Sequence, residues 1–135
     1  MGFLSRLLGI CRTRPPAAPE AWRYAQGSLE IELPRVQELE QPGGAVRLEG
    51  RGLPVRVLIV HGEDGEYHAF RNHCTHAGRR LDPLPGQPNL MCCSVNKSTY
   101  DYHGDKLAGP AKGPVDTYPV DRRGHLLIVD LSETG

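Results

Sequence analysis

The sequence predicts an all-β domain, and two observations support that prediction. The chain of 135 residues holds 16 glycines and 12 prolines, many of them between short apolar runs, which favours a turn-rich fold over helices. These runs recur at regular spacing as about nine short strands, the pattern of a small barrel or sandwich. A chain of this length forms one domain with a core of its own.

The predicted strands follow one another from residue 21. Trp22 and Tyr24 alternate with polar residues, as do the apolar residues of 29–33, which indicates strands with one buried face. Residues 55–60 form a nearly continuous apolar run, as expected of a central strand buried on both faces. Glu63-Asp64-Gly65 predicts a hairpin turn. Further strands are expected over residues 45–49, 66–70, 105–108, 115–120 and 125–130, and a brief helix, with Pro34 in its first turn, over residues 35–39.

Residues 1–20 are predicted to be a segment distinct from the domain of residues 21–135. The first 14 residues combine apolar side chains at roughly helical spacing with interspersed arginines, as in a basic amphipathic helix. The apolar part is too short for a secretory signal and no small-residue cleavage site follows. Contact of residues 1–14 with a membrane surface is one alternative, and a terminal helix packed on its own domain is favoured. Prolines 15, 16 and 19 then form a stiff linker.

Charge and cysteine usage narrow the function class. Lys and Arg total 16, as do Asp and Glu, so nothing indicates electrostatic capture of nucleic acid. The four cysteines do not have the spacing of a disulfide framework, because Cys11 is remote and Cys92 and Cys93 are adjacent. We therefore expect cysteines kept for metal binding or packing in a reducing compartment, and a cytoplasmic protein. Cys11 carries no sign of a site role.

The stretch from Cys74 to Asp101 gathers residue types that bind metal. It opens with Cys74-Thr-His76, continues through a proline-rich loop to Cys93, and has Asn96 three positions later. Sulfur and imidazole ligands on two short loops suit iron or zinc. The oxygen of an Asn side chain is a hard donor that binds iron poorly beside thiolates. Position 96 is therefore the weak member of this predicted set.

These motifs resemble the Rieske iron–sulfur domains, over approximately residues 46–130. The family pattern is Cys-x-His followed, after a spacer, by Cys-x-x-His-Gly. Cys74, His76, Leu81 and Cys93 match it at the family's spacing. Downstream, the segments Leu-Ala-Gly-Pro-Ala (107–111) and Val-Asp-Thr-Tyr-Pro-Val (115–120) resemble the part of Rieske ferredoxins that follows the cluster loops. The resemblance implies the Rieske all-β fold, a base of antiparallel strands with a two-loop cap over residues 71–101.

The resemblance also implies a [2Fe–2S] cluster. Cys74 and Cys93 would hold the inner iron and His76 the outer one. Asn96 falls on the second histidine position, and Lys97 on the glycine after it. In the family, two imidazole ligands raise the reduction potential to roughly −150 to +300 mV, against about −400 mV for all-cysteine ferredoxins. The second loop therefore differs from the family pattern at two positions, 96 and 97, and position 96 is the one where a ligand of the outer iron is expected.

Two further positions match the high-potential Rieske proteins. Ser98 and Tyr100 fall where those proteins keep hydroxyls that donate hydrogen bonds to sulfur, which implies a cofactor-binding role; ordinary strand chemistry is the alternative. The fourth ligand would be Asn96 itself, water, or a substitute such as His73, His103 or Cys92. Because successive residues of an extended segment point to opposite faces, only one of the adjacent cysteines 92 and 93 can face the site without a bulge.

The function predicted from these residues is one-electron transfer. The chain would be a small Rieske-type protein with a variant [2Fe–2S] cluster, serving a redox partner protein or oxidoreductase subunit as a carrier rather than an autonomous enzyme. Two alternatives remain open. A single zinc or iron ion could be held by Cys74, His76 and Cys93 with an open fourth position, or the fold has lost its cluster and acts as a non-redox interaction or structural module.

Overall fold

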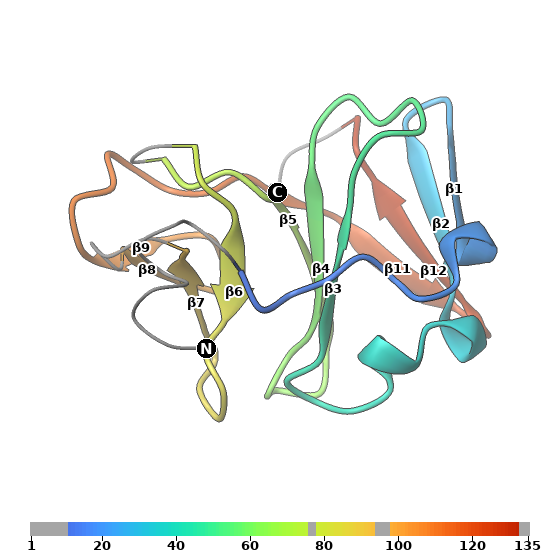
Figure 1. Cartoon of the computed structure of the whole chain (residues 1–135), viewed down its shortest axis with the longest axis horizontal. Helices are drawn as coiled ribbons and strands as arrows, with labels where there is room; N and C mark the ends of the chain where they lie inside the picture. The colour runs from blue at the N-terminus through green and yellow to red at the C-terminus, as the bar shows by residue number, and fades with distance from the viewer. Residues whose placement is uncertain (1–10, 76–77, 94–97, 133–135) are drawn as a thin grey trace.

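The computed structural model describes residues 11–75, 78–93 and 98–132. They form three four-stranded antiparallel sheets, which lie in a row from the cap to the far end of the molecule (Figure 1). The base sheet has the order β1 (Trp22–Ala25), β2 (Ser28–Glu32), β12 (Leu126–Asp130), β11 (Val120–Arg123). The middle sheet has the order β10 (Thr117–Tyr118), β5 (Tyr67–Arg71), β4 (Val57–His61), β3 (Ala45–Leu48).

The third sheet forms the cap. Its order is β6 (Leu81–Pro83), β7 (Asn89–Cys92), β8 (Thr99–Asp101), β9 (Lys106–Ala108). All strand pairs of the three sheets are antiparallel. The predicted all-β class, with antiparallel strands below a cap, is confirmed. The strands β6, β7 and β8 add regular structure to a cap that the sequence predicted chiefly as two loops.

The middle sheet separates two apolar cores. Its residues Val57 and Ile59 pack into the core shared with the base sheet. The residues between them and after them, Leu58 and Val60, pack into the core shared with the cap. All four side chains are fully buried, as expected when successive residues of a strand point to opposite faces. The prediction of a central strand buried on both faces is confirmed, and this strand connects the cap rigidly to the base.

Two local predictions need correction. The brief helix expected over residues 35–39 is instead two single 3₁₀ turns, η2 (Leu33–Arg35) and η3 (Gln37–Leu39), joined by Val36 with a non-helical ψ of 85°. The strand expected over residues 115–120 is divided into β10 and β11 by Pro119, which has no N–H to donate to a sheet. A third 3₁₀ turn, η1 (Pro19–Ala21), precedes β1.

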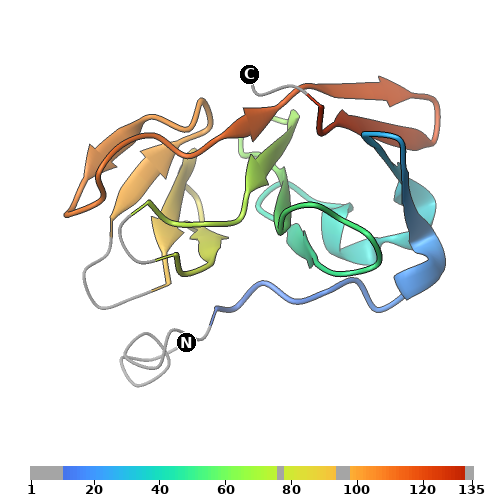
Figure 2. The ribbon, with the colours of Figure 1, turned by 90° about the horizontal axis from the view of Figure 1, so that it is seen from above.

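The segment before η1 runs along the outside of the cap and the middle sheet. From residue 11 it passes from the cap, along the middle sheet, to β1 (Figures 1 and 2). The amphipathic helix predicted for residues 1–14 lies mostly outside the described residues, and the division between residues 20 and 21 stays a prediction. Within residues 11–75, 78–93 and 98–132, no helix has the length and apolar composition needed to cross a bilayer.

Candidate metal centre

The first loop of the site joins β5 to β6 and holds Cys74 in a fully buried position. The Cys74 N–H donates to the Arg79 carbonyl at 2.7 Å, and the Gly78 N–H donates to the Cys74 carbonyl at 2.8 Å. Gly78 has a φ of +70°, a backbone conformation that is unfavourable for any residue with a Cβ atom. The buried Asn72 closes the loop, because its side-chain oxygen accepts from the Leu81 N–H at 2.7 Å. The loop is therefore fixed at both ends.

Two arginines tie this loop to the middle sheet. Arg56 donates to the Gly78 carbonyl at 2.6 Å and to the Asn72 carbonyl at 3.1 Å. Arg80 donates to both carboxylate oxygens of Glu49, at 2.6 and 2.8 Å. The bond from Arg80 lowers the pKa of Glu49, and the same bond raises the pKa of Arg80. Such bidentate pairs add geometric specificity, so the position of the loop is set by side chains that precede it in the sequence.

The Tyr100 hydroxyl contacts both the thiol of Cys74 and the hydroxyl of Thr75. The Tyr100 hydroxyl lies 3.4 Å from Cys74 Sγ and 3.2 Å from Thr75 Oγ1. Thr75 donates its own hydroxyl hydrogen to the Gly113 carbonyl at 2.7 Å. The Tyr100 hydrogen is then left to Thr75 Oγ1 or to the sulfur, and a thiolate would be the stronger acceptor. Burial, and next the contact with Cys74, raise the pKa of Tyr100 to about 12, so the hydroxyl keeps its hydrogen at neutral pH.

Ser98 has a different role from Tyr100 in this structure. It is buried, and its Oγ accepts a hydrogen bond from the Ala111 N–H at 3.0 Å. Gly109 packs against it: a Cβ on Gly109 would lie 2.5 Å from Ser98 Cα. The Gly-Pro-Ala motif therefore has a physical reason here, because only a glycine lets this segment approach the second loop so closely. A contact of Ser98 with a cofactor stays a prediction.

The second loop departs from the expected arrangement at Cys93. Cys93 forms a disulfide with Cys11, 82 positions away, and the two Cα atoms are 5.5 Å apart. The expectations that the cysteines form no disulfide and that Cys11 has no part in the site are therefore wrong for this structure. The reason is tertiary: the Asp82 carboxylate accepts from the Arg12 and Thr13 N–H groups at 2.7 and 2.9 Å. That contact places Cys11 beside Cys93.

The two adjacent cysteines point in opposite directions. Cys92 pairs with Leu81 across β7 and β6, and the Cys93 N–H continues this ladder by donating to the Arg80 carbonyl at 2.9 Å. Successive residues of a strand face opposite sides. Cys92 accordingly packs in the same buried cluster as Cys74, and Cys93 faces Cys11 and Asp82. Cys92, rather than Cys93, thus belongs to the buried cluster that contains Cys74.

Some of the predicted ligands of the outer iron lie outside the described residues, and two histidines that could replace them lie within. His76 and Asn96 lie outside the described residues, so their roles as ligands stay predictions. His73 packs on Gly78, and burial followed by the charges of Arg71 and Arg56 lowers its pKa. A lowered pKa favours the neutral imidazole that binds metals. His103 is exposed on the turn after β8, and its role as a substitute ligand stays a prediction.

Comparison with known proteins decides the family. The Rieske [2Fe-2S] domain model matches residues 30–119, which is more than half of the chain. The chain belongs to the Rieske [2Fe-2S] domain family. This confirms the family resemblance and the Rieske fold that the sequence motifs predicted.

Among its relatives are small ferredoxins and larger Rieske subunits. The ferredoxin component of the naphthalene 1,2-dioxygenase system of Pseudomonas putida is 30% identical over 90 residues, which cover 63% of this chain and 86% of the relative. The cytochrome bc1 complex Rieske iron-sulfur subunit of Corynebacterium efficiens is 30% identical over 80 residues, 53% of this chain but only 20% of the relative. The chain thus spans a fifth of that subunit and most of the ferredoxin.

A solved structure agrees with the ferredoxin relationship. The ferredoxin of carbazole 1,9a-dioxygenase from Nocardioides aromaticivorans superposes with a TM-score of 0.56 at 25% identity, covering 66% of this chain and 86% of the other. These small Rieske ferredoxins agree with the predicted class of small electron-transfer protein. They agree also with the predicted pairing of such a protein with an oxidoreductase.

The described residues can be tested against the cofactor of the family, which takes two thiolates on one iron. Cys74 keeps a buried thiol, whereas the sulfur of Cys93 is bonded to Cys11. A disulfide sulfur is not a thiolate and does not ligate iron in that way. In this disulfide-bonded form, the described part of the predicted ligand set does not fit the cluster. A fit requires that the Cys11–Cys93 bond be reduced and that the Cys93 side chain turn from Asp82 towards Cys74.

Sequence reasoning missed three contributors to the site. Thr75 stands inside the Cys-x-His motif, and the motif gives no sign that its hydroxyl would touch Tyr100. Asp82 and Cys11 are far apart in the chain, and no local pattern connects them. Only the place of Asp82 between two apolar residues, Leu81 and Pro83, offered a sequence signal that its carboxylate has a specific partner.

Proposed function

We propose that this Rieske protein is a small electron carrier with a variant [2Fe–2S] cluster, serving an oxidoreductase system. One observation supports this most: within the Rieske fold, the buried Tyr100 hydroxyl lies 3.4 Å from Cys74 Sγ. A hydrogen bond from a buried hydroxyl to a ligand sulfur tunes a metal centre.

The proposed ligands follow the family pattern. With the Cys11–Cys93 disulfide reduced, Cys74 and Cys93 would hold the inner iron and His76 the outer one, with Asn96 or a substitute in the fourth position. When bound, the cluster supplies one-electron uptake and release. The chain itself excludes water around the buried Cys74, holds the first loop through Arg56 and Arg80, and presents the Tyr100 hydroxyl to sulfur. No residue here is proposed to act on a substrate.

The proposed partner is an oxidoreductase component that exchanges one electron with this protein. Relatives named as ferredoxin components of dioxygenase systems support this. A cytoplasmic location belongs to the same proposal, because reducing surroundings would keep Cys93 as a thiol. The balanced charge of the chain does not favour a nucleic-acid partner.

The test is the iron and sulfide content of protein purified without oxygen and under reducing conditions. We expect a red-brown protein with roughly two irons and two acid-labile sulfides per chain. Asn96→His should increase retention of the iron during gel filtration, because it restores an imidazole at the family position. Asn89→His, which adds a histidine on β7, is the matched control and should leave retention unchanged. Colourless wild-type protein without iron or sulfide would refute the electron-carrier function.

A second candidate is a Rieske fold that has lost its cluster and acts as a non-redox interaction or structural module. The Cys11–Cys93 disulfide favours it, because that bond uses a family ligand to stabilise the fold. The same purification separates the candidates. A module would be colourless even with Cys11 and Cys93 reduced, and zinc alone in the protein would indicate a single-ion site.

A further inference from the structure

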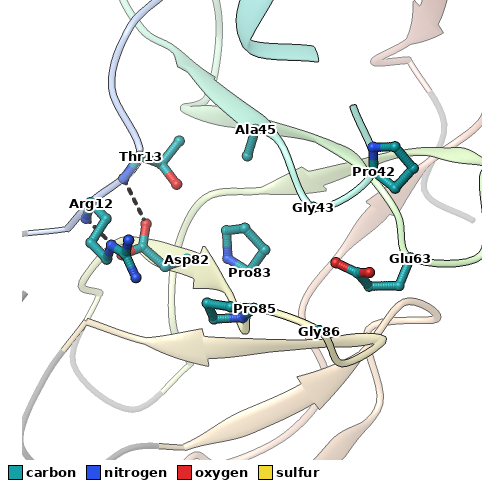
Figure 3. Close-up of a pocket in the computed structure, with 10 residues that line it drawn as sticks. All are labelled: Arg12, Thr13, Pro42, Gly43, Ala45, Glu63, Asp82, Pro83, Pro85 and Gly86. Atoms are coloured by element: carbon teal, nitrogen blue, oxygen red, sulfur yellow. Dashed lines mark hydrogen bonds between the residues drawn. The ribbon is translucent and has the colours of Figure 1, made fainter. Parts of the chain in front are cut away.

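Residues 11–14 form a segment, which we call the latch, that lies across the junction of the cap and the middle sheet. The N–H groups of Arg12 and Thr13 both donate to the Asp82 carboxylate on β6, at 2.7 and 2.9 Å (Figure 3). The Arg14 carbonyl accepts from the Arg47 N–H on β3 at 3.0 Å. Thr13 is buried. The latch is therefore docked by backbone hydrogen bonds to two sheets.

The cap sheet places the docking carboxylate and the thiol side by side. Asp82 pairs with Met91 across β6 and β7, and Cys93 stands two residues after Met91, on the same face. The side-chain donor atoms of Cys11, Asp82 and Cys93 all lie within 4.8 Å of one another. Docking of the latch on Asp82 consequently delivers Cys11 to Cys93.

The two sulfurs of the disulfide differ in their access to solvent. Cys93 is 3% exposed, whereas Cys11 is only partly buried. A pocket of about 480 Å³ opens beside the latch, lined by Arg12, Thr13 and Asp82 on one side and by Pro42, Gly43 and Glu63 on the other (Figure 3). The greater exposure of Cys11 makes its sulfur the more accessible of the two to small thiols.

We propose that Cys11–Cys93 is a redox-active disulfide, opened by dithiol reductants, which controls whether Cys93 is available to the metal centre. In the closed form, the latch is bonded to Cys93 and the second thiolate of the ligand set is missing. In the open form, Cys93 is a thiol, and a turn of its side chain from Asp82 towards Cys74 would complete the family ligand pair. The control of metal binding rests on the proposed function, and the exchange reaction at the disulfide does not.

The exchange reaction conserves atoms and electrons. A thiolate of the dithiol attacks Sγ of Cys11, the S–S bond breaks, and Cys93 leaves as a thiolate. The second thiol of the reductant then attacks the mixed disulfide, releases Cys11 as a thiol and closes a disulfide in the reductant. Two electrons and two protons pass from the dithiol to the protein. Attack on Cys11 is favoured because Cys93 is buried.

The first experiment tests the exchange without any metal. The protein is equilibrated with mixtures of reduced and oxidised dithiothreitol, unreacted thiols are alkylated, and the peptides that contain residues 11 and 93 are quantified by mass spectrometry. We expect these two cysteines to become protected together as the mixture becomes more oxidising. Independent alkylation of Cys11 and Cys93 at every ratio would overturn the proposal.

Asp82 is the positioning residue, and its substitution gives a graded test. Asp82→Asn keeps the size of the side chain but can accept fewer hydrogen bonds, so the equilibrium constant for the disulfide should fall on the order of tenfold. Asp105→Asn, an exposed carboxylate elsewhere in the cap, is the matched control and should leave the constant unchanged. Equal constants for the Asp82 and Asp105 variants would refute delivery of Cys11 by the latch.

The second experiment tests the control of metal binding, with cobalt(II) alone as the probe in anaerobic, thiol-free buffer. Cobalt–thiolate absorption reports binding, and Cys11→Ser leaves Cys93 without a disulfide partner. We expect absorption in Cys11→Ser and in pre-reduced wild type, and at least roughly tenfold less in pre-oxidised wild type. Equal absorption of oxidised and reduced wild type would overturn the control by Cys93 alone. Absence of absorption in every form would overturn that control, and the iron and sulfide content of the reduced protein tests the proposed function separately.

Discussion

The close approach of Gly109 to the second loop gives a prediction that the structure makes quantitative. Gly109 has a φ of +94°, and a Cβ there would lie 2.5 Å from Ser98 Cα and 2.8 Å from Ser98 Oγ. The left-handed backbone alone costs a residue with a Cβ about 1–2 kcal/mol. Because the nearest atom belongs to the backbone, no side-chain rotation relieves the contact, and overpacking of this kind costs typically about 1–3 kcal/mol.

Gly109→Ala should therefore lower the free energy of unfolding by about 2–5 kcal/mol, a large part of the stability of a domain of this size. Gly65→Ala is the matched control: Gly65 has a φ of +82°, but a Cβ there would meet nothing within 4 Å, so only the backbone cost of about 1–2 kcal/mol applies. Urea unfolding of the oxidised proteins, followed by circular dichroism, measures both. Equal losses for the two variants would show that the contact with Ser98 is not a tight one.

Three further predictions concern the surroundings of the site. Tyr100→Phe removes the hydroxyl beside Cys74 Sγ and should cost about 1 kcal/mol of unfolding free energy, measured in urea; no loss would mean that the contact is unimportant to the fold. Glu49→Gln should cost at most about 1 kcal/mol at neutral pH. Arg80 lowers the pKa of Glu49 in the folded protein. The ion pair therefore stabilises the fold fully at pH values above the unfolded-state pKa of Glu49. This stabilisation is lost as the pH falls through the folded-state pKa. Wild type and variant should therefore converge in acid, and a constant gap below pH 4.5 would contradict this. Cys11→Ser opens a loop that spans 82 positions and should lower the stability of the oxidised protein by up to about 4.5 kcal/mol, with reduced wild type as the control.

The strands and the site motifs could be predicted because their signals are local. Alternation of apolar residues shows which face of a strand is buried, as in β1 and β2, and an uninterrupted apolar run marks the doubly buried β4. The same reasoning failed for residues 35–39, where apolar spacing also suits two 3₁₀ turns. Periodicity distinguishes buried from exposed positions better than it distinguishes a short α-helix from 3₁₀ turns.

The sequence by itself determined the all-β class and the Rieske family, because short patterns and motif spacing carry that information. Only the tertiary structure decided what the other cysteines do. Cys92 packs in the buried cluster that contains Cys74, and Cys93 is bonded to Cys11. Which cysteine does which depends on the face of β7 to which each side chain points, and on the docking of the latch on Asp82. Contacts between residues so far apart in the chain arise from the packing of whole sheets, which no local pattern records.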